Sequence, residues 1–154
     1  MPFGRIAAAA ALAALAVAAR GAEFRATAEA ASILYDAPSA RAKALFVYGR
    51  DVPLETLVSV EGWTKVRDMT GTIGWIANRA LADKRMLVVR TPVADIRAAA
   101  DEDTPVVFRA EQNVLLELAE TATSATSTST PGWVKVRHRD GQTGFVRVAQ
   151  VFGL

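Results

Sequence analysis

The amino-acid sequence predicts an all-β fold of two tandem small barrels, each with about five short antiparallel strands and a late 3₁₀ turn, after a cleaved signal peptide. Three observations lead to this fold class. A stretch of the chain recurs further along it, its segments are short, β-branched and separated by glycine, and its first 22 residues differ in composition from the rest. Such segments favour strands over helices, and an internal repeat indicates two copies of one unit.

Residues 1–22 have the composition of an export signal. They contain Arg5 and Arg20 but no acidic residue, and residues 6–19 form an apolar run that is followed by small residues suited to cleavage. A helix over that run reaches only about 21 Å, whereas the hydrocarbon core of a membrane is roughly 30 Å thick. We therefore expect a cleaved signal, no membrane anchor, and a mature protein that is periplasmic or secreted.

The charge of the chain changes when this signal is removed. The full sequence has 18 basic and 16 acidic residues, and loss of Arg5 and Arg20 leaves 16 of each. Nucleic-acid binding driven by bulk charge requires a strongly basic surface, so we expect no nucleic-acid partner. The chain has no cysteine, which excludes disulfides and thiolate metal sites and leaves packing to hold the fold together.

The repeat defines the two units. Residues 62–81 align with residues 132–151 at a constant offset of 70, with seven identities that include the pair Trp63/Trp133, three glycine pairs and one valine pair. Upstream the offset is 62, which places the extra residues of the second copy in the Thr/Ser tract at 121–131, a predicted flexible loop. A unit of about 60 residues is marginally stable alone, so we expect the two units to dock on each other.

The first unit, residues 23–85, contains five predicted strands. Gly62 and Gly71 supply the turns between the last three, since a tight turn between twisted strands favours glycine. Residues 77–81 are too short for a free helix and fit one 3₁₀ turn. The predicted strands are residues 32–35, 44–48, 52–60, 63–68 and 72–77.

The second unit, residues 86–154, repeats this order. Asp140-Gly141 is a strong hairpin signal, and residues 147–151 fit a second 3₁₀ turn. The predicted strands are residues 93–97, 106–109, 114–120, 133–139 and 142–147.

These residues carry a resemblance to a known family. In both copies a Gly-Trp-x-Lys-Val-Arg strand, a turn with glycine and a strand that begins Gly-Trp or Gly-Phe resemble the bacterial SH3-like (SH3b-type) domain family. Residues 34–39 look like the opening loop of that family. The resemblance implies a tandem of SH3-like barrels in the bacterial envelope, in a family whose members are mostly binding or targeting modules for cell wall or protein. A fold alone does not choose between those ligands.

The sequence offers little for catalysis or metal binding. His138 is the only histidine and lies next to a predicted hairpin, without the partners that a proton relay or a transition-metal site requires. Asp101, Glu102 and Asp103 are adjacent and lack the alternating oxygen ligands of a calcium loop. We therefore expect no enzyme activity, no catalytic residue, no metal and no cofactor.

The alternation of side chains along a strand points to an aromatic surface instead. If Val66 and Val136 face the core, then Trp63 and Trp133, three positions before them, face outward. By the same alternation, Trp75 and Phe145 face outward from the next strand of each unit. Two tyrosines extend this surface in the first unit only. The candidate ligand-binding residues are Tyr35, Tyr48, Trp63, Trp75, Trp133 and Phe145. Two interpretations stay open, a ligand groove and a packing surface that covers a barrel end or joins the units.

The sequence thus predicts a non-catalytic, exported binding or targeting protein. Its aromatic patches would recognise cell-envelope material, either peptidoglycan or its peptide stems, or an extended segment of an envelope protein. The alternative is a structural accessory subunit of an envelope protein assembly, in which the aromatic residues mediate barrel or protein packing. A basic loop at 39–43 aligns with an acidic loop at 101–105, and we expect these either to attract different ligands or to orient one barrel against the other.

Overall fold

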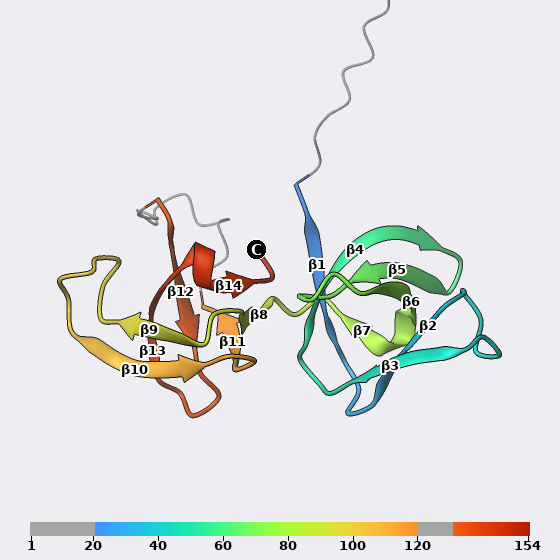
Figure 1. The fold of residues 1–154 in the computed structure, drawn as a ribbon, viewed down its shortest axis with the longest axis horizontal. Helices are drawn as coiled ribbons and strands as arrows, with labels where there is room; N and C mark the ends of the chain where they lie inside the picture. The colour runs from blue at the N-terminus through green and yellow to red at the C-terminus, as the bar shows by residue number, and fades with distance from the viewer. Residues whose placement is uncertain (1–20, 120–130) are drawn as a thin grey trace, which may run out of the picture.

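The computed structural model describes residues 21–119 and 131–154. Nearly all of the expected signal peptide and of the expected Thr/Ser loop lies outside these residues. The described chain forms two antiparallel sheets of seven strands each, and each sheet bends around its own core (Figure 1). The only helical elements in these two ranges are two 3₁₀ turns, and no helix there has the length and apolarity needed to cross a membrane.

The first sheet has the strand order β3-β2-β6-β5-β4-β1-β7. A 3₁₀ turn, η1 (Asn78–Ala80), separates its last two strands in sequence. Its strands are β1 (Glu23–Thr27), β2 (Ser32–Tyr35), β3 (Ala44–Tyr48), β4 (Pro53–Val60), β5 (Trp63–Arg67), β6 (Ile73–Ala77) and β7 (Leu81–Ala82).

The second sheet repeats this topology as β10-β9-β13-β12-β11-β8-β14. Its 3₁₀ turn is η2 (Val148–Gln150). Its strands are β8 (Met86–Val89), β9 (Val93–Arg97), β10 (Val106–Glu111), β11 (Leu115–Leu118), β12 (Trp133–Arg137), β13 (Thr143–Arg147) and β14 (Val151–Phe152).

The all-β tandem fold and the five predicted strands of each unit are confirmed, and each sheet has two strands more than predicted. The first strand of each unit pairs with the last, β1 with β7 and β8 with β14. The short closing strands have two residues each, too few to show an alternating pattern. β8 is a wholly buried apolar run at the junction of the units, and β1 follows directly on the segment assigned to the signal.

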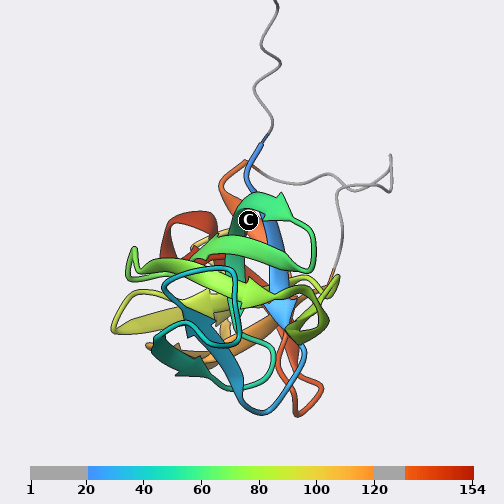
Figure 2. The same ribbon diagram turned by 90° about the vertical axis from the view of Figure 1, so that its right-hand side faces the viewer.

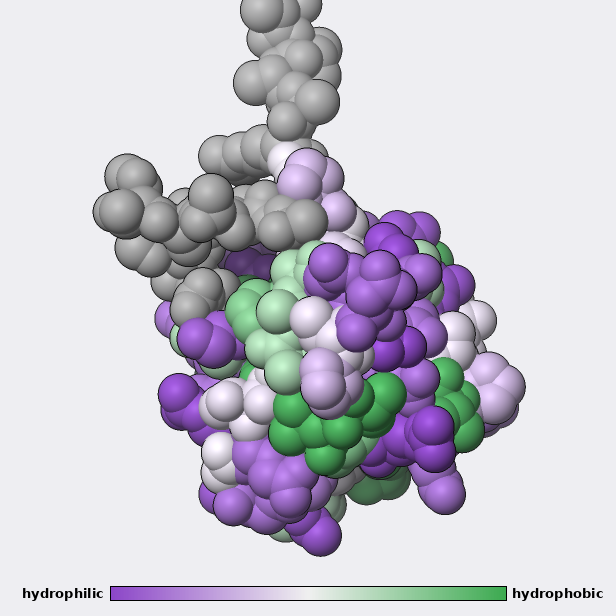
Figure 3. Space-filling view, turned by 90° about the vertical axis from the view of Figure 1, so that its left-hand side faces the viewer, coloured by the Kyte–Doolittle hydropathy of each residue, from purple (hydrophilic) through white to green (hydrophobic). Residues whose placement is uncertain are grey.

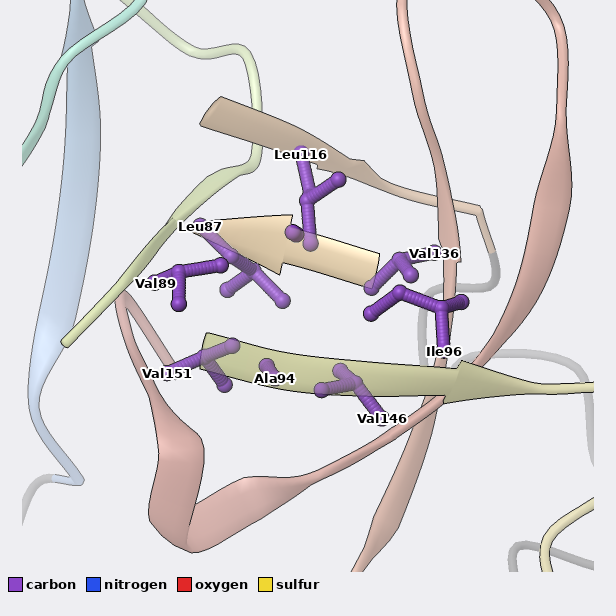
Figure 4. Packing of buried hydrophobic residues seen from close by; sticks show 9 residues of the cluster. Leu87, Val89, Ala94, Ile96, Leu116, Val136, Val146 and Val151 are labelled. Carbon is purple, nitrogen blue, oxygen red and sulfur yellow. The ribbon is translucent and has the colours of Figure 1, made fainter. Parts of the chain in front are cut away.

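Each sheet encloses one apolar core built from equivalent positions. In the first barrel, Leu34, Leu54 and Val66 are fully buried. Figure 4 shows the second core, where the side chains of β8, β9, β11, β12 and β13 point toward one another. The residues labelled there are Leu87, Val89, Ala94, Ile96, Leu116, Val136, Val146 and Val151.

The two cores differ in polarity. Thr27 and Ser32 are fully buried in the first barrel, and their equivalents in the second are Val89 and Ala94. The Thr27 hydroxyl donates to the Gly49 carbonyl over 2.6 Å and accepts from the Val52 amide over 2.9 Å, so its burial leaves no polar atom unpaired.

The tight turns repeat as well. Gly62 and Gly132, which precede β5 and β12, have φ of 76° and 85°, a region that favours glycine. Asp51 and Asn113 also have positive φ, 67° and 71°, and both residue types tolerate this conformation better than most. The backbone amide of each donates to the carbonyl of the last residue in the first strand of its barrel, as Asp51 does to Thr27.

The barrels touch where the two chain ends of the described fold meet (Figures 1 and 2). The ring of Phe24 in β1 lies edge-on to that of Phe152 in β14, with centroids 5.2 Å apart. The Lys84 ammonium, in the connection between barrels, pairs with Asp51 at 3.3 Å. A side chain on Gly153 would approach Pro53 of the first barrel within 3.2 Å. The ring contact joins the barrels, the Lys84 ion pair fixes the connection to the first barrel, and the short distance at Gly153 shows that the end of the second barrel lies against Pro53. That each barrel needs these contacts for stability stays a prediction.

Candidate functional site

Three of the predicted residues come together on the first barrel. Tyr35 of β2 stands opposite Trp75 of β6, and Trp63 lies on the adjoining strand β5. The Tyr35 and Trp63 rings are edge to face, with centroids 5.6 Å apart, and all three side chains are half-buried. We call Tyr35, Trp63 and Trp75 the aromatic face.

Charged groups surround the aromatic face. The Lys65 ammonium lies 5.9 Å from the centroid of the Trp75 ring, within the range of a cation–π contact. Beside Tyr35 is a small hollow of about 50 Å³, whose lining includes Glu29, Ala77 and Arg79. A ligand that covered the rings would thus meet a carboxylate and two cationic groups at its edges.

A glycine brings the strands of the aromatic face together. A Cβ on Gly74 would lie 2.6 Å from Leu34 Cγ and 2.8 Å from the Tyr35 carbonyl oxygen. Because these distances are shorter than van der Waals contact, only glycine lets β6 approach β2 closely enough to set Trp75 opposite Tyr35. Gly144 has the same role in the second barrel, against Ile96 and Arg97.

Tyr48 is not part of the aromatic face. Its side chain is buried in the core of the first barrel, and its hydroxyl donates to Asp68 Oδ2 over 2.8 Å. It belongs inside because it is the last residue of β3, on the inward side of a strand whose other residues are exposed. Burial, and then the hydrogen bond to Asp68, raise the pKa of the Tyr48 phenol well above its usual range.

Asp68 is held by several donors at once. Its Oδ1 accepts from the Thr70 hydroxyl over 2.7 Å and from the Thr70 and Thr72 amides over 2.9 Å each. Burial by itself raises the pKa of this carboxyl, but the bonds from Thr70, Tyr48 and Thr72 outweigh it and lower the pKa below its usual value.

In the second barrel, the equivalent tryptophan is covered. Trp133 is 7% exposed, and the guanidinium carbon of Arg147 lies 4.5 Å from its ring centroid. Arg147 in turn donates from Nε to Glu102 Oε1 over 3.0 Å and makes a second, shorter contact from its Nη2. We call Arg147 and Glu102 the arginine cap.

The remaining positions of this surface also differ between barrels. Phe145 is half-buried under Lys135, whose ammonium lies 6.0 Å from the ring centroid. Arg97 stands opposite Phe145, at the place that Tyr35 has in the first barrel, and donates to the Thr104 carbonyl. The outward surface of the second barrel therefore has the cations Arg97 and Arg147 at the positions where the first barrel has Tyr35 and Ala77.

The arginine cap was not among the predicted features, although the repeat contained its signal. Trp63 pairs across the sheet with Ala77, whereas Trp133 pairs with Arg147. The acidic loop at 101–105 was expected to act on a ligand or on the other barrel, and its Glu102 instead pairs within its own barrel. No ion pair joins this loop to the basic loop at 39–43 among the residues that the structure describes.

The described residues offer no arrangement typical of a catalytic or metal site. His138 Nδ1 lies 3.0 Å from Asp140 Oδ1, and its ring packs at 5.7 Å from that of Phe108. In ranges 21–119 and 131–154, no three histidine or acidic side chains are grouped as metal ligands. On the side of the second barrel drawn in Figure 3, hydrophobic residues form small patches within a mainly hydrophilic surface.

Comparison with known proteins gives the same family for both units. A family model described as bacterial SH3 domain matches residues 28–83 and again residues 91–153. A search among curated proteins found no match.

Solved structures show weaker similarity. NlpC1 and NlpC2 from Trichomonas vaginalis are 13% and 12% identical, with TM-scores of 0.38 and 0.35 over 86% and 88% of this chain and 46% and 49% of theirs. An NlpC/P60 family protein from Bacillus cereus is 13% identical, with a TM-score of 0.38 over 84% of this chain and 56% of its own. The chain thus spans about half the length of these proteins.

Proposed function

This chain belongs to the bacterial SH3 domain family, and on that premise we propose that it is a non-catalytic binding protein of the cell envelope. Its ligand is an extended peptide, of the kind that forms the stems of peptidoglycan, and its binding surface is the aromatic face of the first barrel. The composition of residues 1–22 supports export to the periplasm or beyond.

The observation that carries this proposal is the open aromatic face itself. Tyr35 and Trp63 meet edge to face with Trp75 beside them, and none of the three is fully buried. Aromatic side chains that line a shallow surface bind extended peptides by stacking and by burial of apolar area. The neighbouring Lys65, Arg79 and Glu29 provide partners for the carboxylates and amines of a peptide stem.

The second barrel supports the same assignment by contrast. The arginine cap covers Trp133, so the equivalent stacking surface is already occupied by a side chain of the protein. A ligand would have to displace Arg147 and break its contacts with Glu102 before it reached the ring. We therefore assign ligand binding to the first barrel.

Co-sedimentation with purified peptidoglycan sacculi tests this function. The protein without residues 1–22 is expected to sediment with sacculi, and Trp75→Ala is expected to reduce the bound fraction at least tenfold. Phe145→Ala is the matched control, because it removes the equivalent ring from the second barrel and should leave binding unchanged. Circular dichroism verifies that both variants are folded.

Two results would contradict the proposal. One is failure of the unsubstituted protein to sediment with sacculi at low ionic strength. The other is equal loss of binding in Trp75→Ala and Phe145→Ala, since that would place the ligand on both barrels or on neither aromatic surface. Recovery of one envelope protein in stoichiometric amount, without sacculus binding, would favour the accessory-subunit function instead.

A further inference from the structure

A second concave surface lies between the barrels, and none of the residues of the aromatic face lines it. This cleft has a volume of about 430 Å³ and is lined by both units. Its lining includes Arg50 and Asp51 of the β3–β4 turn and Lys84 of the connection. It also includes Arg137, the last residue of β12, and the two residues after it, His138 and Arg139. We call this the inter-barrel cleft.

The inter-barrel cleft is basic although the mature chain is neutral. Its lining has four permanent cations, Arg50, Lys84, Arg137 and Arg139, and two carboxylates, Asp51 and Glu117. One cation is paired, because the Lys84 ammonium lies 3.3 Å from Asp51. Three arginines remain, all of them exposed, and none has an ion pair among the residues that the structure describes.

The repeat shows that one of these arginines lacks an ion pair that its equivalent in the first barrel makes. In the first barrel, Glu55 stands opposite Arg67, and the arginine donates from Nε to Glu55 Oε2 over 2.8 Å. In the second barrel, Glu117 stands opposite Arg137 in the same register. In the described ranges these two make neither a hydrogen bond nor an ion pair, and both line the cleft. The guanidinium of Arg137 is therefore available to a ligand.

We propose that the inter-barrel cleft binds a small polyanion through Arg50, Arg137 and Arg139, with carboxylate or phosphate groups as the recognised chemistry. Guanidinium groups bind both kinds of oxyanion in bidentate geometry. A concave site lined by three cations strengthens such binding, because its walls exclude part of the solvent that screens charge. Arg50 comes from the first barrel and the others from the second, so one anion would link the two units.

This site is independent of the proposed peptide binding, and its test uses other ligands. Isothermal titration of the full chain without residues 1–22 is carried out at low ionic strength, with citrate as the carboxylate probe and pyrophosphate as the phosphate probe. Saturable 1:1 binding of either is expected, and the stronger of the two identifies the source of the oxyanion. Added salt is expected to weaken the binding.

Substitutions locate the anion. Arg137→Gln/Arg139→Gln is expected to lower the affinity at least tenfold, and Arg67→Gln, at the equivalent position of the first barrel, should leave it unchanged. Glu117→Gln should raise the affinity severalfold, because it removes a carboxylate from the cleft. The proposal is overturned if neither probe binds, or if Arg67→Gln and the double variant lower the affinity equally. Thermal unfolding verifies that each variant is folded.

Discussion

The guanidinium of Arg147 lies on the ring of Trp133, with its central carbon 4.5 Å from the ring centroid, whereas the equivalent Trp63 has Ala77 at its side. This one pair of positions distinguishes the outward surfaces of the two barrels. The same tryptophan on the same strand is half-buried and beside Tyr35 in one unit, and buried under a cation in the other.

Removal of the arginine cap should expose the second tryptophan. In a Trp63→Phe/Trp75→Phe background, Trp133 is the only tryptophan, and Arg147→Ala is expected to increase quenching of its fluorescence by acrylamide. Stability should fall by about 0.5–2 kcal/mol, the range of a cation–π contact. Equal quenching before and after the substitution would show that Arg147 does not cover the ring. The reciprocal Ala77→Arg should cover Trp63 and weaken sacculus binding.

The two tryptophans should also differ in their contribution to stability. Trp133 is 7% exposed, so Trp133→Ala is expected to lower the free energy of unfolding by about 3–5 kcal/mol. Trp63 is half-buried on an open surface, and Trp63→Ala should lower it by less than half as much. Urea unfolding followed by circular dichroism measures both. A larger loss for Trp63 would mean that the aromatic face is a packing surface.

Gly74 should tolerate no side chain. A Cβ there would lie 2.6 Å from Leu34 Cγ and 2.8 Å from a backbone oxygen, so Gly74→Ala is expected to destabilise the protein by about 1–3 kcal/mol. Gly49→Ala is the control, since a Cβ at Gly49 has no heavy atom within 4 Å. Comparable midpoints of urea unfolding for the two variants would contradict the close approach of β6 and β2.

The bond between Tyr48 and Asp68 should limit stability at both ends of the pH range. The pKa of Asp68 is lowered in the folded state, so its contribution is present above about pH 4 and is lost as the pH falls further. The pKa of Tyr48 is raised, so its contribution is present below about pH 10 and is lost as the pH rises further. The free energy of unfolding is measured across this range.

Two variants separate these limits. Tyr48→Phe should lose about 1.5–3 kcal/mol near neutral pH, as for a hydrogen bond to a charged group, and should flatten the alkaline limb. Asp68→Asn should flatten the acid limb. If Tyr48→Phe keeps the steep alkaline loss, another group causes it.

The contact between Phe24 and Phe152 should couple the barrels. Phe152→Ala is expected to lower the melting temperature and to increase the spread of inter-barrel distances seen by small-angle scattering, because the edge-on ring contact and its buried area are lost. Val148→Ala serves as a control at an exposed position of the same barrel. Unchanged scattering in Phe152→Ala would mean that the ring contact does not hold the units together.

The repeat and the strand period were enough to predict most of the fold. Val66, Val136, Ile76 and Val146 are fully buried as their positions in the alternation require. The strands β7 and β14 were missed because strands of two residues have no period, and β8 was missed because a uniformly buried strand shows no alternation.

The candidate site was predictable only in part. Alternation placed Trp63 and Trp75 on one surface, and the structure joins Tyr35 to them. Alternation gives the direction of a side chain but not what covers it, so it could not show that Arg147, paired with Glu102, lies over Trp133. Tyr48 was predicted on this surface, but as the last residue of β3 it faces inward, where its hydroxyl donates a hydrogen bond to Asp68.

The pairing of β1 with β7, and of β8 with β14, also determines when each unit can fold. Ala26 pairs with Ala82 and Val89 with Val151, so each barrel closes by contacts between the two ends of its own sequence. Loop closure of this kind is slow compared with local helix formation. Because the N-terminus leaves the ribosome first, the first barrel can close only after β7, near the end of its sequence, has emerged.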